Sequence, residues 1–336
     1  MSKRMVSLVC TVRDEADNIA ALIDSMLQQT QPADEIVIND CGSRDSTCAI
    51  VQGYIARGYP IRLVCGGHNI PSGRNNAIRH AHFELIACTD AGLILDPCWL
   101  ERIVAPLVRD EADVVGGFFR PDPRSIFELA LGATNYRDVT EIDPTTFIPF
   151  GKSCAFRRSA WQQAGGYPEW ASHCEDVLFA LMLRRLGKRF AFVGDALVAF
   201  RPRPTPAAFM RQYLLYARGD GVAGLWRRRH MIRYAAYGVG GMLLVLGMHR
   251  PIAWLGLAAG GWAYVRAPWR RLWRRARGYP VRDQVAAAAL VPAIRLIGDL
   301  AKMIGYPIGI LRRHALAGLA ADVARYWQRM AEQREK

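Results

Sequence analysis

Three groups of polar and acidic residues each follow an apolar run in the N-terminal part of the chain. The groups are Arg13-Asp14-Glu15 after Val6 to Thr11, Asn39-Asp40 after Ile36 to Ile38, and Thr89-Asp90-Ala91-Gly92 after a third apolar run. Carboxylates accept hydrogen bonds from hydroxyl and N–H groups and bind hard cations. Because α/β proteins bind ligands at the carboxyl ends of their strands, we expect the three groups to share one site.

Each acid alone also has an ordinary interpretation. Asp and Gly are common turn residues after strands, and Asp readily caps a following helix. Their joint occurrence, together with the later pair Glu175-Asp176, favours a shared site over separate turns.

The elements that must position these acids alternate along the chain. The pattern predicts strands at 6–11, 35–39, 61–65, 84–89 and 113–117, with helices at about 17–28, 45–57, 72–82 and 98–108. Such alternation is typical of an α/β fold with a mainly parallel sheet flanked by helices. Residues 1–200 contain no Gly-x-x-x-x-Gly-Lys and no Gly-x-Gly-x-x-Gly, which argues against the usual phosphate and dinucleotide loops.

The basic charge of the chain lies in its last third. Residues 1–200 carry 20 Lys and Arg against 24 Asp and Glu, whereas residues 201–336 carry 24 against 6, a net charge of +18. Arg227-Arg228-Arg229 and the segment Arg266 to Arg277 flank a long apolar stretch, Tyr234 to Val265. This arrangement favours an anionic membrane surface as partner and argues against nucleic acid.

The apolar stretch is interrupted by His249-Arg250-Pro251. Its halves, 234–248 and 251–265, have 15 residues each, fewer than the roughly 20 of a spanning helix. Because both flanks are Arg-rich, we expect a helical hairpin that enters and leaves the membrane on the cytoplasmic side. Two tilted spans, or a buried hairpin in a soluble helical domain, are the alternatives.

Two further C-terminal segments have the composition of a membrane interface. Residues 266–277 combine six Arg with two Trp, as expected at a lipid headgroup layer. Residues 286–311 are apolar except for Arg295, Asp299 and Lys302, whose spacing puts them on one stripe of a helix. This helix is expected to lie in the interface or to pack on the catalytic domain.

The N-terminus and the cysteines indicate the compartment. Ser2-Lys3-Arg4 leads directly into a strand-like run without the apolar region of a secretory signal. The eight cysteines show no Cys-x-x-Cys spacing, so we expect neither a zinc site nor a disulfide framework. The predicted location is therefore the cytoplasmic face of the inner (plasma) membrane.

The order of these motifs resembles one enzyme family, the inverting family 2 glycosyltransferases of GT-A fold. The resemblance covers about residues 5–220 and rests on Thr11 to Glu15, Asn39 to Thr47, Gly73-Arg74-Asn75, Asp90-Ala91-Gly92, Gly165-Gly166-Tyr167-Pro168 and Glu175-Asp176. It implies a GT-A catalytic domain at 1–225, followed by a helical, membrane-associated region at 226–336.

The resemblance also implies a site for a nucleotide-sugar donor, with UDP-sugars as the common case. Glu15 and Asp40 are expected to hold the base and ribose, and Arg74 to neutralise the diphosphate. Arg211 and Arg218 are candidates for stabilising the departing diphosphate, with a purely juxtamembrane role as the alternative. The donor-binding residues implied in this way are Thr11, Arg13, Glu15, Asp40, Gly42, Arg74, Asp90, Arg211 and Arg218.

The family's Asp-x-Asp motif binds the divalent cation that bridges the donor diphosphate. Asp90 keeps the first carboxylate of the motif, and Gly92 replaces the second. Mg²⁺ or Mn²⁺ can be held by one carboxylate, substrate phosphates and water, so we expect a metal at Asp90. An Arg or Lys side chain could supply this positive charge instead.

The resemblance assigns Asp176 as general base and Glu175 as a support for geometry or acceptor binding. Asp176 would take the proton from an acceptor hydroxyl that attacks the anomeric carbon, giving inversion through an oxocarbenium-like transition state. The structural alternative is a helix N-terminus made acidic to suit its dipole.

The sequence thus predicts a glycosyltransferase that acts on a lipid-linked or cell-envelope glycan acceptor. A non-catalytic membrane-bound partner with a decayed site is one alternative, and Gly92 is its direct support. A sugar-1-phosphate nucleotidyltransferase is less favoured, because the segment Arg13-Asp14-Glu15 lacks the glycines of a triphosphate loop.

Overall fold

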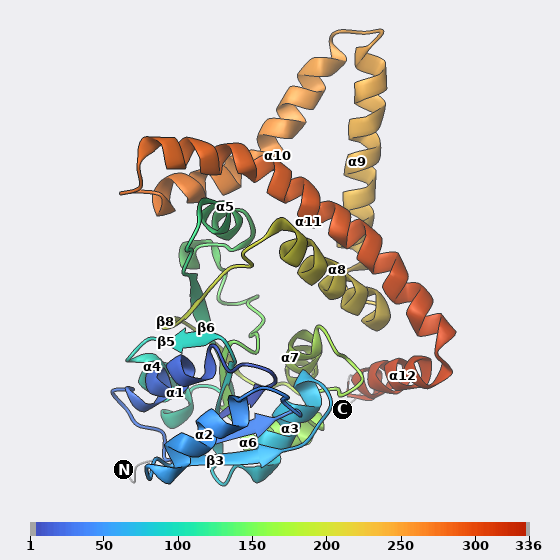
Figure 1. Ribbon diagram of the computed structural model, residues 1–336. Helices are drawn as coiled ribbons and strands as arrows, with labels where there is room; N and C mark the ends of the chain where they lie inside the picture. The colour runs from blue at the N-terminus through green and yellow to red at the C-terminus, as the bar shows by residue number, and fades with distance from the viewer. Residues whose placement is uncertain (1–4, 334–336) are drawn as a thin grey trace. The chain divides into compact units, whose positions relative to one another are not determined.

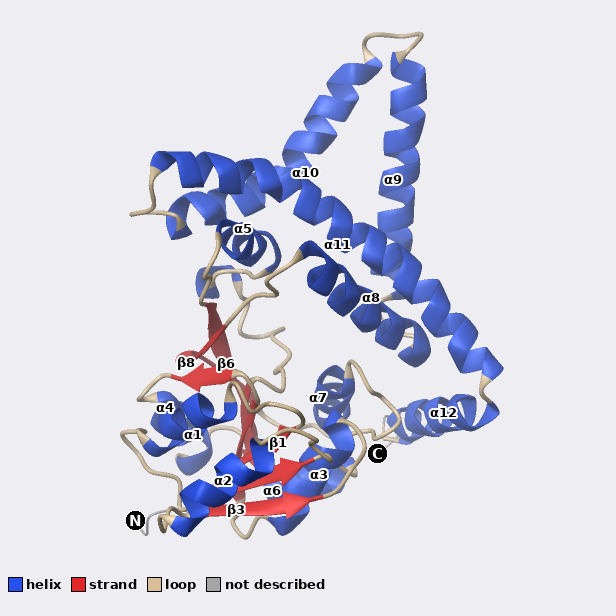
Figure 2. Cartoon of the chain, viewed as in Figure 1, coloured by secondary structure: helices blue, strands red, loops and turns tan. Residues whose placement is uncertain are grey.

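The chain forms two compact units in the computed structural model, which describes residues 5–333. The first unit contains residues up to 120, residues 139–200 and the chain from 324 onward; the second contains 121–138 and 201–323. The secondary structure of both is drawn in Figure 1 and Figure 2. The expectation based on Ser2-Lys3-Arg4 concerns residues outside the described part of the chain.

The first unit is built on an eight-stranded sheet of order β3-β2-β1-β4-β7-β6-β8-β5. Its strands are β1 Val6–Val12, β2 Glu35–Asp40, β3 Ile61–Cys65, β4 Leu85–Asp90, β5 Leu93–Leu95, β6 Val114–Pro121, β7 Ser153–Arg157 and β8 Phe190–Phe200. The strands β3, β2, β1 and β4 are parallel, whereas β7 runs antiparallel to β4 and β6, and β5 runs antiparallel to β8.

Helices cover this sheet as the alternating pattern predicts. They are α1 Ile19–Leu27, α2 Thr47–Ala56, α3 Ile70–His80, α4 Trp99–Val108, α6 Arg158–Ala164 and α7 Glu175–Arg185, with a short 3-10 helix at Val139–Glu141. Every residue of β1 is buried, as expected for a parallel strand covered on both faces. The predicted α/β fold with a mainly parallel sheet is therefore confirmed.

The second unit is helical. It contains α5 Ile126–Asn135, α8 Pro206–Ala223, α9 Arg227–Gly247, α10 Ala253–Arg275 and α11 Val281–Ala315, together with the start of α12 Ala317–Glu332. The helices α8 and α11 approach closely at glycines, since a Cβ added to Gly305 would lie 2.2 Å from the carbonyl oxygen of Leu214. Small residues at such positions let two helix backbones come together.

Three of the arginines in residues 266–277 hold α5 in place. Arg271 donates to the carbonyl of Ala133 at 2.7 Å, and Arg275 donates to the carbonyl of Gly132 at 2.8 Å. Arg274 pairs with Asp138 at 2.6 Å. Cations are favourable at a helix C-terminus, where the last carbonyls lack partners. These three side chains therefore contact α5 and the residue Asp138 after it, and the location of this segment at lipid headgroups stays a prediction.

The helices α9 and α10 form a hairpin, with their connecting turn at the tip (Figure 1). Its apolar side chains are largely exposed: Val239, Met242, Leu244, Val245, Leu246, Met248, Ile252, Trp254, Leu255 and Trp262. Among the described residues, α11 is the helix whose length and composition could suit a membrane span. Insertion of the hairpin stays a prediction.

Candidate active site

The pairing of three parallel strands brings the predicted acidic groups to one edge of the sheet. Thr11 at the end of β1 is in register with Asn39 on one side and with Asp90 on the other, and Val12 is in register with Asp40. The carboxyl ends of neighbouring parallel strands are the usual ligand site of α/β proteins. The structure therefore places Thr11, Asp40 and Asp90 at the same edge.

Asp40 organises the turn that follows β2. Its Oδ2 accepts hydrogen bonds from the N–H groups of Gly42 at 2.9 Å and Ser43 at 3.0 Å, and its Oδ1 accepts one from the Ser43 hydroxyl. Burial raises the pKa of Asp40, but the hydrogen bonds from Ser43 and Gly42 outweigh it and hold that pKa below its usual value. Gly42 has φ +84°, which suits glycine.

Glu15 and Arg13 lie in the loop after β1. The N–H of Glu15 donates to the Thr47 hydroxyl at 2.8 Å, and its Oε2 accepts from the side chain of Asn18 at 3.0 Å. Arg13 is largely exposed and lies 3.8 Å from Asp14. A Cβ added to Gly92 would lie 3.9 Å from Glu15 Oε2, so this loop borders the turn that carries Asp90.

Arg74 contacts Asp90 and Glu175, two acids that are far apart in the sequence. Its Nη2 lies 2.6 Å from Asp90 Oδ1, its Nη1 lies 3.2 Å from Glu175 Oε1, and its guanidinium stands 4.8 Å from the centre of the Tyr167 ring. The side chain is only 1% exposed. Arg74 therefore contacts both acidic side chains with its single positive charge.

Gly73 and Gly151 allow Arg74 to reach this position. A Cβ on Gly73 would lie 2.3 Å from Thr11 Oγ1 and 2.4 Å from Cys41 Sγ, and one on Gly151 would lie 2.5 Å from Arg74 Nη2. Real Cβ atoms do not approach other atoms so closely. The two glycines thus set the close packing of α3 against the strand ends and around the guanidinium.

Glu175 and Asp176 open α7 and have different environments. Glu175 is buried, and this burial, together with the charge of Asp176, raises its pKa to about 8 despite the nearby Arg74. Asp176 is partly exposed; its Oδ2 accepts from the N–H of Gly151 at 3.1 Å, and its Oδ1 accepts from the N–H of Val177 at 2.8 Å. Of the pair, Asp176 is the more exposed carboxylate.

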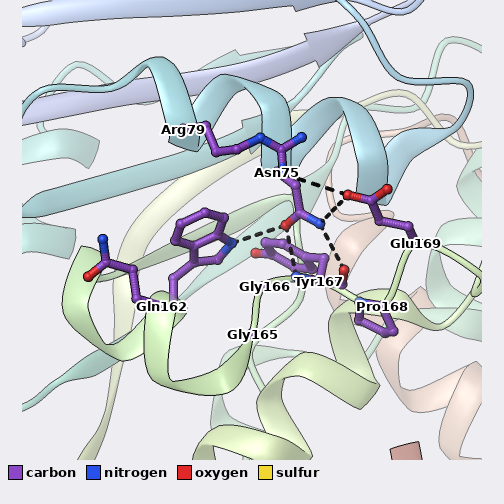
Figure 3. A pocket seen from close by; sticks show the side chains of 9 residues that line it. Asn75, Arg79, Gln162, Gly165, Gly166, Tyr167, Pro168 and Glu169 are labelled. Carbon is purple, nitrogen blue, oxygen red and sulfur yellow. Dashed lines mark hydrogen bonds and ion pairs between the residues drawn. The ribbon is translucent and has the colours of Figure 1, made fainter. Parts of the chain in front are cut away.

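Asn75 has a positioning role that the sequence did not reveal. Its amide oxygen accepts from Trp161 Nε1 at 3.0 Å and from the N–H of Tyr167 at 2.8 Å, while its amide nitrogen donates to Tyr167 O and Glu169 Oε1. Figure 3 shows these contacts beside a surface pocket lined by the Gly165-Gly166 turn. Asn75 directly follows Arg74, and this neighbouring position was the only sequence signal for its role. A buried amide needs several hydrogen-bond partners, and these partners cannot be identified from the sequence.

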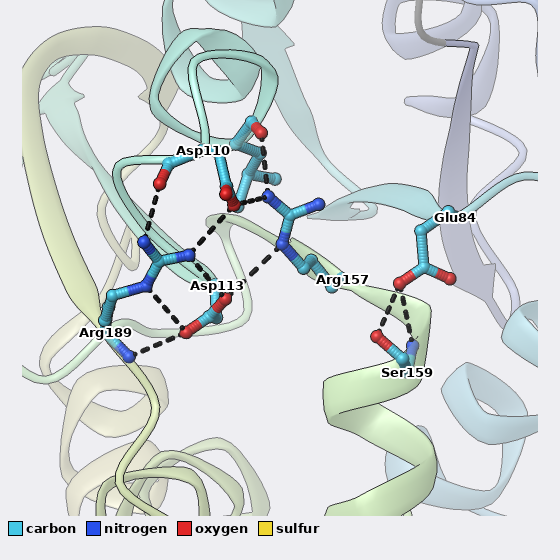
Figure 4. A network of polar contacts seen from close by, with 7 residues as sticks. Glu84, Asp110, Asp113, Arg157, Ser159 and Arg189 are labelled. Atoms are coloured by element: carbon cyan, nitrogen blue, oxygen red, sulfur yellow. Dashed lines mark hydrogen bonds and ion pairs between the residues drawn. The ribbon is translucent and has the colours of Figure 1, made fainter.

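A second charged cluster in the first unit is structural. Arg157 and Arg189 bind Asp110 and Asp113, as Figure 4 shows. Hydrogen bonds from Arg189 lower the pKa of Asp113 to about 2, although burial acts against them. These charges are paired with one another, and they tie the strands together rather than forming a ligand site.

A cation at Asp90 would depend on the donor for most of its ligands. Within residues 5–333 no group of three or more His, Cys, Asp or Glu side chains is arranged to hold a metal ion. Asp90 Oδ1 is engaged by Arg74, and Oδ2 has no hydrogen-bond partner in the described part of the chain. One carboxylate oxygen fits a Mg²⁺ or Mn²⁺ ion that is held mainly by phosphate oxygens and water.

Arg211 and Arg218 lie on α8, in the second unit. Burial and the nearby Arg312 lower the pKa of Arg218. The contribution of both arginines to donor binding stays a prediction.

A family model for glycosyl transferase family 2 matches residues 7–164 of the chain. The uncharacterized glycosyltransferase EpsJ of Bacillus subtilis is 24% identical over 212 residues, which cover 60% of this chain and 62% of EpsJ. Glycosyltransferase AglE of Haloferax volcanii is 23% identical over 228 residues, 66% of this chain and 74% of AglE. The chain thus spans less than two thirds of EpsJ and about three quarters of AglE.

A solved structure has a similar fold. The mannosyltransferase PcManGT of Pyrobaculum calidifontis, in complex with GDP-Man and Mn²⁺, matches with a TM-score of 0.53 and 19% identity. The match covers 94% of this chain and 88% of that structure. At this identity the likeness concerns the fold alone.

Proposed function

Because the chain belongs to glycosyltransferase family 2, we propose that it transfers a sugar from a nucleoside diphosphate donor to a hydroxyl of a lipid-linked or cell-envelope glycan acceptor. The observation that carries this proposal is the cluster of Arg74, Asp90 and Glu175 beside the partly exposed Asp176. A partly exposed carboxylate such as Asp176, held beside the ion-paired side chains of Arg74, Asp90 and Glu175, is suited to accept a proton.

Asp176 acts as the general base in this proposal. The N–H groups of Gly151 and Val177 hold its carboxylate in place. It accepts the proton of the acceptor hydroxyl while the hydroxyl oxygen attacks the anomeric carbon and the nucleoside diphosphate leaves from the opposite face. This single displacement inverts the anomeric centre. Glu175 is buried and engaged by Arg74, so it positions Arg74 and the start of α7 rather than taking the proton.

The donor nucleotide lies at the ends of β1 and β2 in this proposal. Glu15 and Asp40 accept hydrogen bonds from the base and the ribose hydroxyls, and the exposed Arg13 is available to the phosphates. Asp40 Oδ1 accepts from both the hydroxyl and the N–H of Ser43, so a ribose hydroxyl would share this oxygen with Ser43 or replace one of these hydrogen bonds. A UDP-sugar is the proposed donor. Because PcManGT was solved with GDP-Man, GDP is the first nucleotide to compare with UDP in the binding test.

The proposal includes a divalent cation at Asp90 and association of the protein with a membrane. A divalent cation at Asp90 would neutralise the diphosphate, as the Mn²⁺ in PcManGT makes chemically reasonable. The basic second unit and the exposed apolar hairpin of α9 and α10 support association with the cytoplasmic face of an anionic membrane.

One observation supports a competing proposal, a partner protein whose transferase site has decayed. Gly92 stands where the motif has a second carboxylate, and the metal would have a single protein ligand. Asp40, Asp90 and Asp176 are nevertheless all present and ordered by hydrogen bonds. Nucleotide binding distinguishes the two proposals.

The test is thermal unfolding of the detergent-purified protein with UDP, GDP, dTDP and CDP, each with and without Mn²⁺ or Mg²⁺. A nucleotide that binds the folded state raises the unfolding temperature by mass action. We expect UDP to stabilise the wild type, and the variants Asp40→Ala and Asp90→Ala to lose this effect. Arg109→Ala, an exposed arginine paired with Glu111, is the control. If no nucleotide stabilises the wild type, the decayed-site alternative replaces the enzyme.

A further inference from the structure

A polar cluster lies among the helices of the second unit, on the stripe of α11 that the sequence analysis singled out. Arg295, Asp299 and Lys302 come from α11, Arg233 from α9 and Tyr264 from α10. The donor site contains none of these residues. Their function is therefore a separate question from catalysis.

Asp299 is fully engaged within this cluster. Its Oδ1 accepts from Arg233 Nε at 2.9 Å and lies 3.6 Å from Lys302 Nζ. Its Oδ2 accepts from the hydroxyls of Tyr264 at 2.8 Å and Tyr237 at 3.3 Å. One carboxylate thus joins three helices and compensates one unit of positive charge.

Arg295 has no carboxylate partner in the part of the chain that the structure describes. Its guanidinium stands 4.2 Å from the centre of the Tyr264 ring, and its buried Nε makes no hydrogen bond. Lys302 is similarly placed over an aromatic ring, with Nζ 4.8 Å from the centre of Tyr213. A buried donor without a partner is costly, so its retention points to an absent acceptor.

The charges of the cluster do not balance. Arg233 and Lys302 pair with the carboxylate of Asp299, and Arg295 lies near Lys302, so three cations stand against one carboxylate. The next acid, Asp220, lies 3.3 Å from His230 and is also close to Arg233 and Arg229. When Asp220 and Arg229 are counted with the cluster, four Arg and Lys side chains stand against two carboxylates. The excess is about two positive charges, which matches the charge of a phosphomonoester near neutral pH.

The surroundings of the cluster indicate that such a phosphate belongs to a lipid. On α11, Leu296 and Leu300 flank the charged stripe and are exposed, and the apolar hairpin of α9 and α10 extends from the helices that carry Arg233 and Tyr264. A soluble phosphate would not require this apolar surface. Tyrosines beside cations, next to exposed apolar side chains, are typical of a lipid headgroup region.

We propose that Arg233, Arg295 and Lys302 form a binding site for the dianionic phosphate headgroup of a membrane lipid, whose hydrocarbon chain lies along the apolar faces of α9 and α10. Arg295 supplies its unpartnered Nε–H, and Lys302 supplies a charge that Asp299 compensates only in part. This site does not depend on the proposed sugar transfer.

The experiment is vesicle co-sedimentation of the full chain without donor or acceptor sugar. The vesicles contain phosphatidylcholine with phosphatidic acid, or with enough phosphatidylglycerol to give the same surface charge. We expect the wild type to prefer phosphatidic acid, and the double variant Arg295→Gln/Lys302→Gln to lose that preference. Binding should weaken about fivefold for each cation removed.

A matched control separates this site from general basicity. Arg270→Gln/Arg277→Gln removes the same charge from exposed positions outside the cluster and should keep the preference for phosphatidic acid. Circular dichroism and thermal unfolding identify a variant that has not folded. If the double variant does not fold, the single variant Arg295→Lys is used instead, because it keeps the charge but removes the Nε–H. This variant should lower the preference for phosphatidic acid.

Three outcomes would overturn the proposal. One is equal binding of the wild type to phosphatidic acid and to charge-matched phosphatidylglycerol. Another is an equal loss in the cluster variant and in the control variant. The third is competition by millimolar inorganic phosphate at constant ionic strength, which would assign the site to a soluble phosphate. Failure of sugar transfer would leave all three readouts unchanged.

Discussion

Arg74 Nη2 lies 2.6 Å from Asp90 Oδ1, so the carboxylate expected to hold a cation already carries a buried positive partner. The same guanidinium contacts Glu175 through its other terminal nitrogen. The donor side of the site and the start of α7, which carries the proposed base, are therefore linked through one side chain. A change at Arg74 should affect both.

Replacing Arg74 with Gln tests this link. The variant leaves Asp90 and Glu175 without their shared cation, and the free energy of unfolding should fall by about 3 kcal/mol. At pH 9, where the wild-type Glu175 is ionised, adding Glu175→Gln should recover part of this loss, because the buried side chain then carries no charge. Urea unfolding of the wild type, the two single variants and the double variant measures the coupling. Strictly additive effects would show that the contact between Arg74 and Glu175 contributes nothing.

Glu175 should make the stability of the first unit depend on pH. Its pKa is raised to about 8 in the folded protein, against an ordinary value near 4.5, so the unfolded chain releases this proton at lower pH. Between these two values the folded state binds more protons, and stability therefore falls as pH rises from about 5 to about 8. Above pH 8 the contribution no longer changes.

The variant Glu175→Gln carries no such proton and should show a flatter profile over the same range. Denaturant unfolding at pH 5, 6, 7 and 8 measures the difference. Glu111→Gln, an exposed acid paired with Arg109, is the control and should keep the slope of the wild type. A slope that survives in Glu175→Gln would assign the pH dependence to another group.

The elements of the parallel half of the sheet could be predicted from sequence, because such strands are buried on both faces and appear as apolar runs. The predicted strand 6–11 corresponds to β1, and the predicted strand 35–39 corresponds to β2. The strand β7 was not predicted, since Ser153–Arg157 contains polar residues and pairs with distant strands. Its position beside β4 depends on tertiary packing.

The candidate site was predictable as a set of residues but not as a set of contacts. The spacing of Asp40 and Asp90 after apolar runs indicated a shared edge of the sheet, and the register of the strands agrees. The ion pair between Arg74 and Glu175 joins residues 101 positions apart, so no local pattern encodes it. The burial of Arg74 likewise depends on the packing of α3 against the strands.

Asp176→Asn should abolish sugar transfer without affecting donor binding. The amide keeps the shape and can still accept the N–H of Gly151, but it cannot take a proton from the acceptor. We expect kcat to fall by about 100-fold or more, while stabilisation by the donor nucleotide stays unchanged. Sugar transfer from a radiolabelled donor and thermal unfolding provide the two readouts. Transfer at the rate of the wild type would exclude Asp176 as the base.

Gly92→Asp should strengthen metal binding. The position has φ +72°, and a Cβ there meets no atom closer than Glu15 Oε2 at 3.9 Å, so the space is open but the backbone is unfavourable. A second carboxylate beside Asp90 should increase the stabilisation by Mn²⁺ together with UDP, at a cost of about 1 kcal/mol in the unfolding free energy. Gly92→Ala isolates this backbone cost, because alanine adds a Cβ without a ligand. If Gly92→Asp gains no more from Mn²⁺ than Gly92→Ala, the metal does not bind at this turn.

The exposed apolar surface of α9 and α10 should anchor the protein to vesicles. Leu246 and Leu255 are 43% and 70% exposed, so Leu246→Gln/Leu255→Gln removes apolar area without leaving a cavity. Partitioning into anionic vesicles should weaken by about tenfold for each side chain. Met5→Gln/Ile94→Gln changes two exposed apolar residues of the first unit and serves as the control. The membrane fraction of the hairpin variant is then washed with alkaline carbonate. If the variant stays in the membrane, anchoring by the hairpin is contradicted, and a span formed by α11, whose length and composition suit one, is indicated.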